Sequence, residues 1–178
     1  MNHHSDEKYC VTGTKTSQLG RFLIRLDTVK KDGKEYSYSY IVQKNSVGVL
    51  AFENDMLILI RQYRHSINSY EYEIPGGGIE KGEKPIDVAI HEMVEETGFA
   101  VDSIEELGFY YPSPGSSDEK CYLFVAQCHN EGKPKREPLE FITVELVTEE
   151  VFTQLIKTGQ FKHSMGLVAW LKYLIKRG

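Results

Sequence analysis

Three glutamates near the middle of the chain could bind a metal ion. Glu92, Glu95 and Glu96 follow one another at helical spacings, in a segment whose apolar residues also recur with a helical period. Such spacings place the carboxylates on one face, where like charges repel each other. The cluster is stable when a cation lies among the carboxylates or when water surrounds them. Carboxylate oxygens suit hard divalent ions such as Mg²⁺ and Mn²⁺, which usually also bind phosphate groups of a substrate.

A glycine loop and a helix must position these glutamates. The run Gly76 to Gly78 lets the backbone pass close to a bulky group. The helix is predicted over Pro85 to Thr97, because proline suits the first turn and Gly98 suits a left-handed end. Its expected buried stripe is Ile86, Ala89, Ile90, Met93 and Val94, with the glutamates on the opposite face. A glycine loop leading into an acidic helix is therefore a candidate divalent-metal site.

The same stretch resembles the signature of the Nudix hydrolases. The residues that match the signature are Gly77, Glu83, Glu92, Met93, Glu95, Glu96, Gly98 and Phe99. His91 stands where the family has arginine, so the permanent charge and planar fork of arginine are absent at that position. The resemblance implies an α/β protein, a Nudix-type α/β/α sandwich around a mixed sheet.

A second segment narrows the resemblance to the ADP-ribose pyrophosphatase branch of the family. Ser113, Pro114 and Gly115, followed by Glu119, match a loop that this branch carries downstream of the signature. The branch implies hydrolysis of the diphosphate bond of ADP-ribose or another nucleoside diphosphate sugar, with Mg²⁺ or else Mn²⁺ as cofactor. Two alternatives stay open: a hydrolase of GDP-mannose or UDP-sugars, and a Nudix-like module that senses a nucleotide without hydrolysing it.

The resemblance also implies roles for single residues. The expected metal ligands are the carbonyl group of Gly76 and the carboxylates of Glu92, Glu95 and Glu96. Glu119 is expected to activate the attacking water, with Glu95 as a second catalytic carboxylate. Glu83 and His91 are expected to orient neighbouring groups. The expected substrate contacts are Arg61 and Arg64 to phosphate, Tyr38 to the base, and Gly115.

Composition limits the kind of partner. The 178 residues are 40% hydrophobic and 26% charged, as is ordinary for a globular protein, and the net charge of −5 argues against binding nucleic acid or an anionic membrane. No apolar run is long enough to span a membrane. Cys10, Cys121 and Cys128 fit neither a zinc site nor an even disulfide framework. We therefore expect a cytoplasmic protein that binds neither nucleic acid nor a membrane. The resemblance implies that its partner is a small nucleoside diphosphate sugar.

The remaining predicted elements are mostly strands. Strands are predicted at residues 9–12 (a short one), 21–29, 36–43, 46–52, 56–61, 70–74, 107–111, 120–127 and 141–147. Thr148 and Ser164 are predicted to cap two later helices. The second of these has an apolar face that is expected to be core, made of Leu167, Val168, Trp170, Leu171, Leu174 and Ile175.

The strands suggest two parts of the chain. Residues 1–45 are expected to form an N-terminal antiparallel strand extension, and residues 46–178 the Nudix domain. Members of the branch exchange such N-terminal strands between two subunits and stack the base there. The resemblance therefore implies a homodimer, in which tyrosines such as Tyr38 could contact a base.

Overall fold

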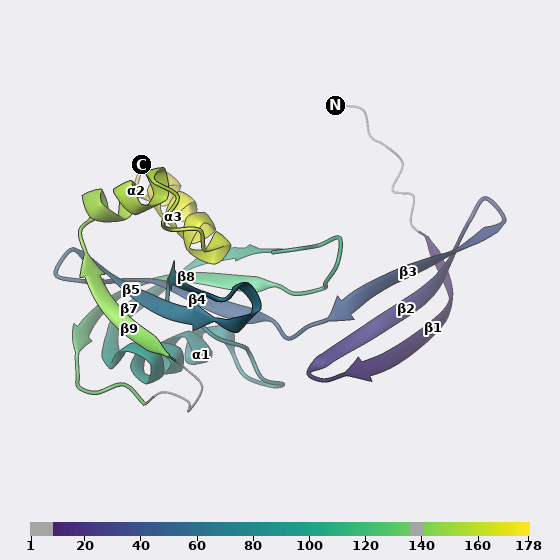
Figure 1. The fold of residues 1–178 in the computed structure, drawn as a ribbon, viewed down its shortest axis with the longest axis horizontal. Helices are drawn as coiled ribbons and strands as arrows, with labels where there is room; N and C mark the ends of the chain where they lie inside the picture. The colour runs from purple at the N-terminus through teal and green to yellow at the C-terminus, as the bar shows by residue number, and fades with distance from the viewer. Residues whose placement is uncertain (1–8, 136–140) are drawn as a thin grey trace. The chain divides into compact units, whose positions relative to one another are not determined.

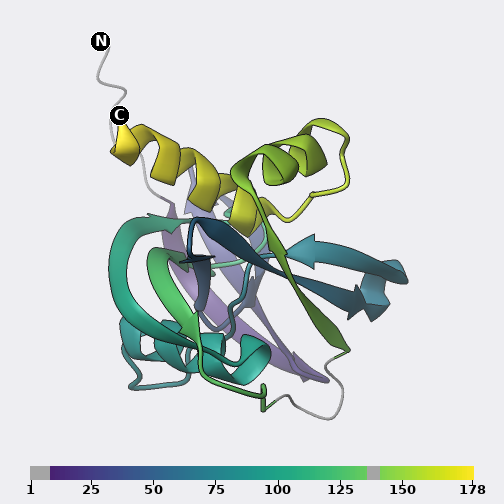
Figure 2. The ribbon, with the colours of Figure 1, turned by 90° about the vertical axis from the view of Figure 1, so that its left-hand side faces the viewer.

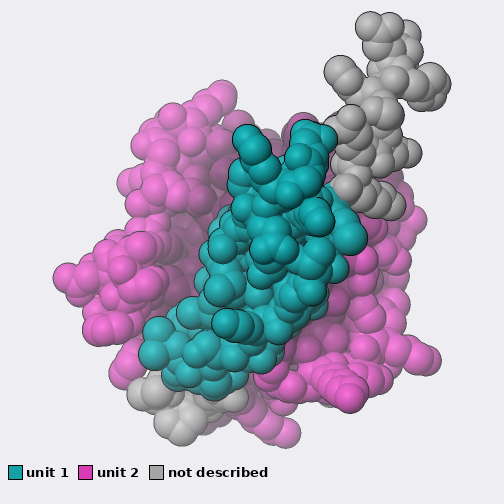
Figure 3. Space-filling view, turned by 90° about the vertical axis from the view of Figure 1, so that its right-hand side faces the viewer, with its two compact units in different colours: residues 1–43, 113–119 teal, residues 44–112, 120–178 magenta. Residues whose placement is uncertain are grey.

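Two sheets make up most of the fold, and they belong to different units of the chain (Figure 1). The computed structural model describes residues 9–135 and 141–178. The first unit contains the chain up to residue 43 together with residues 113–119, and the second contains residues 44–112 and 120–178 (Figure 3). The division into an extension and a Nudix domain at residue 45 stays a prediction.

The first unit is a three-stranded antiparallel sheet in the order β1–β2–β3. Its strands are β1 (Cys10–Leu19), β2 (Phe22–Lys31) and β3 (Lys34–Val42). The predicted strands at residues 21–29 and 36–43 are confirmed as β2 and β3, which form an antiparallel hairpin. Its turn contains Asp32 and Gly33 with positive φ angles of 52° and 76°. The expectation of only a short strand at residues 9–12 was wrong, because β1 pairs with β2 along its whole length. Every residue of β1 is exposed, and its sequence does not alternate between apolar and polar residues, so the pattern does not predict the strand.

Residues 113–119 are tied to the end of β3 within this unit. The amide of Ile41 donates to the carbonyl of Ser116 at 2.9 Å. The amide of Gln43 donates to a carboxylate oxygen of Asp118 at 2.8 Å. The loop that carries Gly115 and Glu119 is therefore held by the strand that carries Tyr38.

The second unit is built on a mixed six-stranded sheet. The strands are β4 (Ser46–Glu53), β5 (Met56–Arg64), β6 (Ser69–Glu73), β7 (Phe99–Tyr110), β8 (Cys121–Asn130) and β9 (Ile142–Val147). They run in the order β6–β5–β4–β8–β7, and β9 lies off this path and also pairs with β5. The β4–β8 pair is parallel, and the other pairs are antiparallel. The predicted mixed sheet is confirmed.

β4 separates from β5 after three paired residues, and this opening receives the glycine loop. Only residues 51–53 of β4 pair with β5. Farther back along β4, the amide of Val49 donates to the carbonyl of Pro75 and the amide of Val47 to that of Gly77, each at 2.9 Å. The loop after β6 (Ser69–Glu73) thus takes the place of a strand next to β4.

Helices cover both faces of the sheet, as Figure 2 shows. On one face lies α1 (Pro85–Glu92), which continues as a π-helical turn, η2 (Met93–Thr97). On the other face lie α2 (Glu149–Lys157) and α3 (Ser164–Arg177). Two separate apolar clusters fill the layers, one around Met93 and Val49 and one around Phe152 and Trp170. The predicted α/β/α sandwich is confirmed. In the described residues, no helix is both long and apolar enough to cross a membrane.

The structure corrects the predicted helix before Gly98 in three ways. Its last five residues form the π-helical turn η2 rather than a continuation of the α-helix. Ile86 is 39% exposed, whereas Val88, which was not in the expected stripe, is buried. Glu96 is buried too, although it was expected on the outer face. The left-handed end at Gly98 is confirmed, with a φ angle of 79°.

The two C-terminal helices match the predictions in part. The Thr148 cap is confirmed, since its hydroxyl accepts a hydrogen bond from the amide of Val151 at 3.3 Å. The Ser164 cap was wrong, because Ser164 is the first helical residue and the cap position belongs to His163. The expected core face of α3 was also wrong in its second half. Leu171, Leu174 and Ile175 are exposed, whereas Gly166, Ala169 and Trp170 are buried.

Candidate functional site

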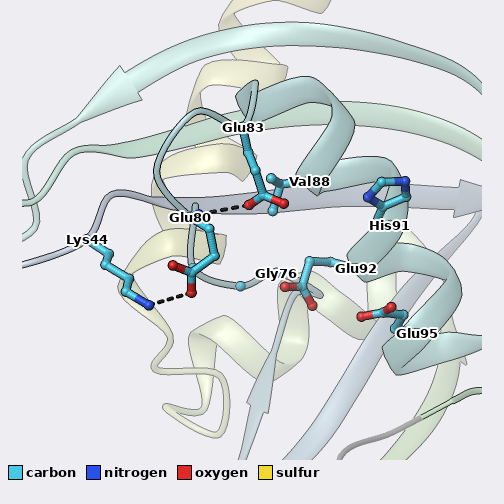
Figure 4. A pocket seen from close by; sticks show the side chains of 10 residues that line it. Lys44, Gly76, Glu80, Glu83, Val88, His91, Glu92 and Glu95 are labelled. Carbon is cyan, nitrogen blue, oxygen red and sulfur yellow. Dashed lines mark hydrogen bonds and ion pairs between the residues drawn. The ribbon is translucent and has the colours of Figure 1, made fainter. Parts of the chain in front are cut away.

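A pocket of about 430 Å³ opens beside the glycine loop of the second unit (Figure 4). It is lined by Lys44, Gly76, Gly77, Gly78, Glu80, Glu83, Val88, His91, Glu92 and Glu95. The structure therefore brings together several predicted site residues, namely Gly76, Glu83, His91, Glu92 and Glu95. Because α1 and the loop after β6 meet at the opened edge of β4, residues distant in the sequence share one cavity.

Two positions of the loop must be glycine because neighbouring atoms leave no room for a side chain. A Cβ atom on Gly77 would lie 1.8 Å from a carboxylate oxygen of Glu92, and one on Gly76 would lie 2.1 Å from the carbonyl oxygen of Val47. Both distances are too short for a contact between atoms that are not bonded to each other. Glycine at these positions lets the loop approach both β4 and the side chain of Glu92. The Glu92 carboxylate therefore lies directly against the backbone of the loop.

Glu96 supports the loop from the interior. It is only 4% exposed, and one of its carboxylate oxygens accepts a hydrogen bond from the amide of Gly76 at 2.9 Å. It is not among the residues that line the pocket. Within the described ranges, no three His, Cys, Asp or Glu side chains gather into a group that could hold a metal ion. Glu92 and Glu95 thus face the pocket, while Glu96 fixes the backbone beside it.

A chain of polar contacts holds the loop that follows the glycines. Lys44 forms an ion pair with Glu80, and both side chains are 63% exposed. The amide of Glu80 donates to a carboxylate oxygen of Glu83 at 2.8 Å, which gives Glu83 a role in shaping this loop. The amide of Ile79 donates to the carbonyl of Asn45 at 2.8 Å. Neither Lys44 nor Glu80 was predicted, since a lysine before a strand and a glutamate in a turn carry no distinctive sequence signal.

A second polar cluster lies at the end of β6 (Ser69–Glu73). The buried carboxylate of Glu73 accepts hydrogen bonds from the guanidinium of Arg64, one of them at 2.7 Å. His163 approaches the same carboxylate at 3.7 Å, and its Nδ1 atom accepts a hydrogen bond from the amide of Ile74 at 3.3 Å. Burial lowers the pKa of His163, although the negative charge of Glu73 opposes this effect. A neutral imidazole is consistent with its role as an acceptor.

The predicted arginines do not line the pocket. Arg64 is ion-paired with Glu73. Arg61 lies over the rings of Tyr70 and Tyr72, at 5.6 and 5.9 Å from the ring centroids. Their contact with phosphate stays a prediction. A carboxylate at an inward position of a strand, such as Glu73 in β6, requires a charged or hydrogen-bonding partner, and this requirement is the sequence signal for its pairing with Arg64.

Three predicted site residues belong to the first unit. Tyr38 is 41% exposed, and its ring centroid lies 6.2 Å from that of Tyr40. Gly115 is exposed in the loop of residues 113–119, and Glu119, at its end, is half-buried. Their roles toward the substrate stay predictions.

The fold and the pocket define an α/β protein in which an acidic helix and a glycine loop form one site. A model of the NUDIX domain matches residues 42–166, and the chain therefore belongs to the Nudix family. The matched segment includes the whole glycine loop, α1 and η2. The first part of the resemblance seen in the sequence is thereby confirmed.

Two relatives and one solved structure refine this assignment. The chain is 32% identical over 137 residues to an ADP-ribose pyrophosphatase of Bacillus subtilis, covering 75% of this chain and 74% of that protein. It is also 32% identical over 171 residues to a methanol dehydrogenase activator of Bacillus methanolicus, covering 90% of each. A crystal structure of an ADP compounds hydrolase has the same fold, with a TM-score of 0.84 over 98% of this chain and 95% of that chain, at 23% identity. The predicted branch is confirmed, and the chain is a Nudix pyrophosphohydrolase.

Proposed function

We propose that this enzyme hydrolyses the diphosphate bond of ADP-ribose or another nucleoside diphosphate sugar, with Mg²⁺ as cofactor. The products would be a nucleoside monophosphate and a sugar phosphate. The observation that carries the proposal is the pocket in which the glycine loop brings the Glu92 carboxylate against the backbone, beside Glu95. The similarity to an ADP-ribose pyrophosphatase supports the substrate class.

The pocket fits a hard divalent ion by the chemistry of its donors. Carboxylate and carbonyl oxygens are the ligands that Mg²⁺ prefers, and this ion commonly uses one or two carboxylates while water and substrate phosphates complete its shell. The proposed ligands of the ion are the carboxylates of Glu92, Glu95 and Glu96 and the carbonyl of Gly76. Glu96 would also fix the amide of Gly76 beside the ion. Mn²⁺ has similar ligand preferences and could replace Mg²⁺.

The charge of the pocket explains why a cation is needed. Its lining includes the carboxylates of Glu80, Glu83, Glu92 and Glu95. A diphosphate would be repelled by this lining if no positive charge were added. A bound divalent ion would neutralise phosphate oxygens and lower the pKa of a coordinated water. The protein's own part is to orient the substrate, exclude other geometries and accept the proton of the attacking water.

Several residues of the chain are proposed for these tasks. Glu119 would take the proton of the attacking water, and Glu95 is the second candidate for that step. Glu83 would keep the loop in shape, and His91 would orient a neighbouring carboxylate. The proposed substrate contacts are Arg61, Arg64, Tyr38 and Gly115, the tyrosine by stacking on a base.

A substrate panel tests the proposal. The protein is incubated with Mg²⁺ and, in turn, with ADP-ribose, UDP-glucose, GDP-mannose and a dinucleoside polyphosphate, and the products are separated by chromatography. We expect AMP and ribose 5-phosphate from ADP-ribose, and no products when the metal is removed by a chelator. Binding of a nucleotide without release of any monophosphate would contradict the proposal and favour a sensor.

The quaternary structure is a separate part of the proposal. A cytoplasmic homodimer with exchanged N-terminal strands follows from the resemblance to the branch. Light scattering coupled to size-exclusion chromatography should give the mass of two chains, and a mass of one chain would refute the dimer. Deletion of residues 1–43 should then convert the dimer to a monomer.

A further inference from the structure

We propose that Lys44 binds the substrate's phosphate groups and that Glu80 holds this lysine when no substrate is present. The inference rests on the proposed function, because it assigns a substrate contact within the same pocket. Lys44 lies two residues before the start of β4 (Ser46–Glu53), at the edge where the glycine loop is inserted. In this view Glu80 and the diphosphate compete for one ammonium group.

Lys44 differs in charge from the other residues that line the pocket. Among the described residues that line the pocket, it alone carries a permanent positive charge (Figure 4). Figure 4 shows its ammonium group turned toward Glu80, on the side of Gly76 away from Glu95. An ammonium group on a flexible side chain is a point charge that binds phosphate without a fixed geometry. Lys44 can therefore bring an anionic ligand into a pocket that is otherwise acidic.

The ion pair is not needed to hold the loop. The backbone on either side of it is fixed by other contacts, namely the Ile79 amide to the Asn45 carbonyl at 2.8 Å and the Glu80 amide to Glu83 at 2.8 Å. The amide of Lys120 donates to the side-chain oxygen of Asn45 at 2.9 Å. The Lys44 side chain can therefore leave Glu80 while the backbone of both segments keeps its position.

Because Lys44 and Glu80 are exposed, breaking their ion pair costs little free energy. Both side chains of the pair are 63% exposed. Water screens such pairs, and they contribute little to stability. A diphosphate carries more negative charge than one carboxylate and attracts the ammonium group more strongly. Substrate binding should therefore displace Glu80 from Lys44.

If Glu80 and the substrate compete for Lys44, the two single variants should change the KM in opposite directions. An ion pair that only stabilised the loop would not give this result. Lys44→Met removes the phosphate contact and should raise the KM for the sugar nucleotide by about fivefold to tenfold. Glu80→Gln removes the competitor and should lower the KM by about twofold. If the pair only fastened the loop, both variants would lose the same fastening and change the KM in the same direction. Opposite signs are thus the diagnostic result.

The experiment measures kcat and KM for the best substrate of the panel in both variants. Lys176→Met is the matched control, because it breaks a comparable exposed ion pair with Glu105, outside the pocket lining. We expect the control to keep the wild-type KM, and all three variants to keep the wild-type melting temperature. An unchanged KM in Lys44→Met, or a raised KM in both pocket variants, would overturn the proposal.

A binding measurement separates this inference from the proposed function. Calorimetry gives the Kd of methylenediphosphonate, a diphosphate that is not hydrolysed, in the presence of Mg²⁺. Lys44→Met should weaken this binding and Glu80→Gln should strengthen it, even if the wild-type protein hydrolyses none of the panel substrates. In that case the proposed function fails while the phosphate contact stands. Equal Kd values in wild type and Lys44→Met would refute the contact whatever the activity.

Discussion

Gly77→Ala should strongly reduce the activity of the enzyme while leaving its fold intact. The added Cβ atom would lie 1.8 Å from a carboxylate oxygen of Glu92, and real Cβ atoms do not come within 3.0 Å of another atom. The carboxylate must therefore move by at least about 1.2 Å, which rotation about the side-chain bonds of Glu92 allows. A displacement of about 1 Å in a catalytic site can cost about 100-fold in rate.

Gly76→Ala is the matched comparison. Its Cβ atom would lie 2.1 Å from the backbone carbonyl of Val47, which cannot move without disturbing β4. Overpacking of this kind typically costs about 1–3 kcal/mol. The two neighbouring substitutions thus separate an effect on the site from an effect on the fold.

The assay combines activity, metal binding and stability. For Gly77→Ala we expect kcat/KM about 100-fold lower, weaker Mn²⁺ binding by electron paramagnetic resonance, and a melting temperature within about 2 °C of wild type. For Gly76→Ala the melting temperature should fall clearly. Wild-type activity and Mn²⁺ binding in Gly77→Ala would refute the reasoning, because they would show that the position of the Glu92 carboxylate does not matter.

Four further predictions concern other groups. Glu119→Gln should slow turnover strongly with unchanged metal affinity, and an unchanged rate would place the base elsewhere. Glu96→Gln keeps an acceptor for the amide of Gly76 but removes a negative charge from the proposed metal site, so it should fold normally yet lose about 10–100-fold in activity; near-wild-type turnover would remove Glu96 from the site. Burial raises the pKa of Cys128 to about 12, so a thiol reagent at pH 8 should modify Cys10 but not Cys128 until the protein unfolds. Burial lowers the pKa of His163, so on acidification this imidazole is protonated at a higher pH in the unfolded state than in the folded state. The melting temperature should therefore fall as the pH drops below about 6.5, and His163→Gln should reduce this dependence.

The parts of the site that depend on local sequence could be predicted. Pro85 and Gly98 mark the limits of the helical segment, and the glycines before it were expected to allow a close approach. The structure confirms both limits, and it gives Gly77 a specific neighbour in Glu92. Such features are visible in one sequence because backbone preferences act over a few residues.

The parts that depend on tertiary contacts could not be predicted. Lys44 and Glu80 are separated along the chain and meet only because the glycine loop inserts beside β4. The strand β1 carries no apolar alternation, since its pairing with β2 rather than burial specifies it. Leu171 belongs to the predicted apolar face of α3 but is exposed, whereas its neighbour Trp170 is buried. Periodicity shows which residues share a face, whereas burial depends on what lies opposite.

The π-helical turn η2 (Met93–Thr97) explains how one short segment uses its acidic residues in different ways. In a regular α-helix, residues four apart such as Glu92 and Glu96 share one face. A π-helical turn forms hydrogen bonds over five residues and shifts the following side chains around the axis, and such turns are frequent at functional sites. Here Glu96 lies in the interior and binds the amide of Gly76, whereas Glu92 and Glu95 face the pocket. The repulsion expected from three adjacent carboxylates is thereby reduced, because one of them has a backbone donor of its own.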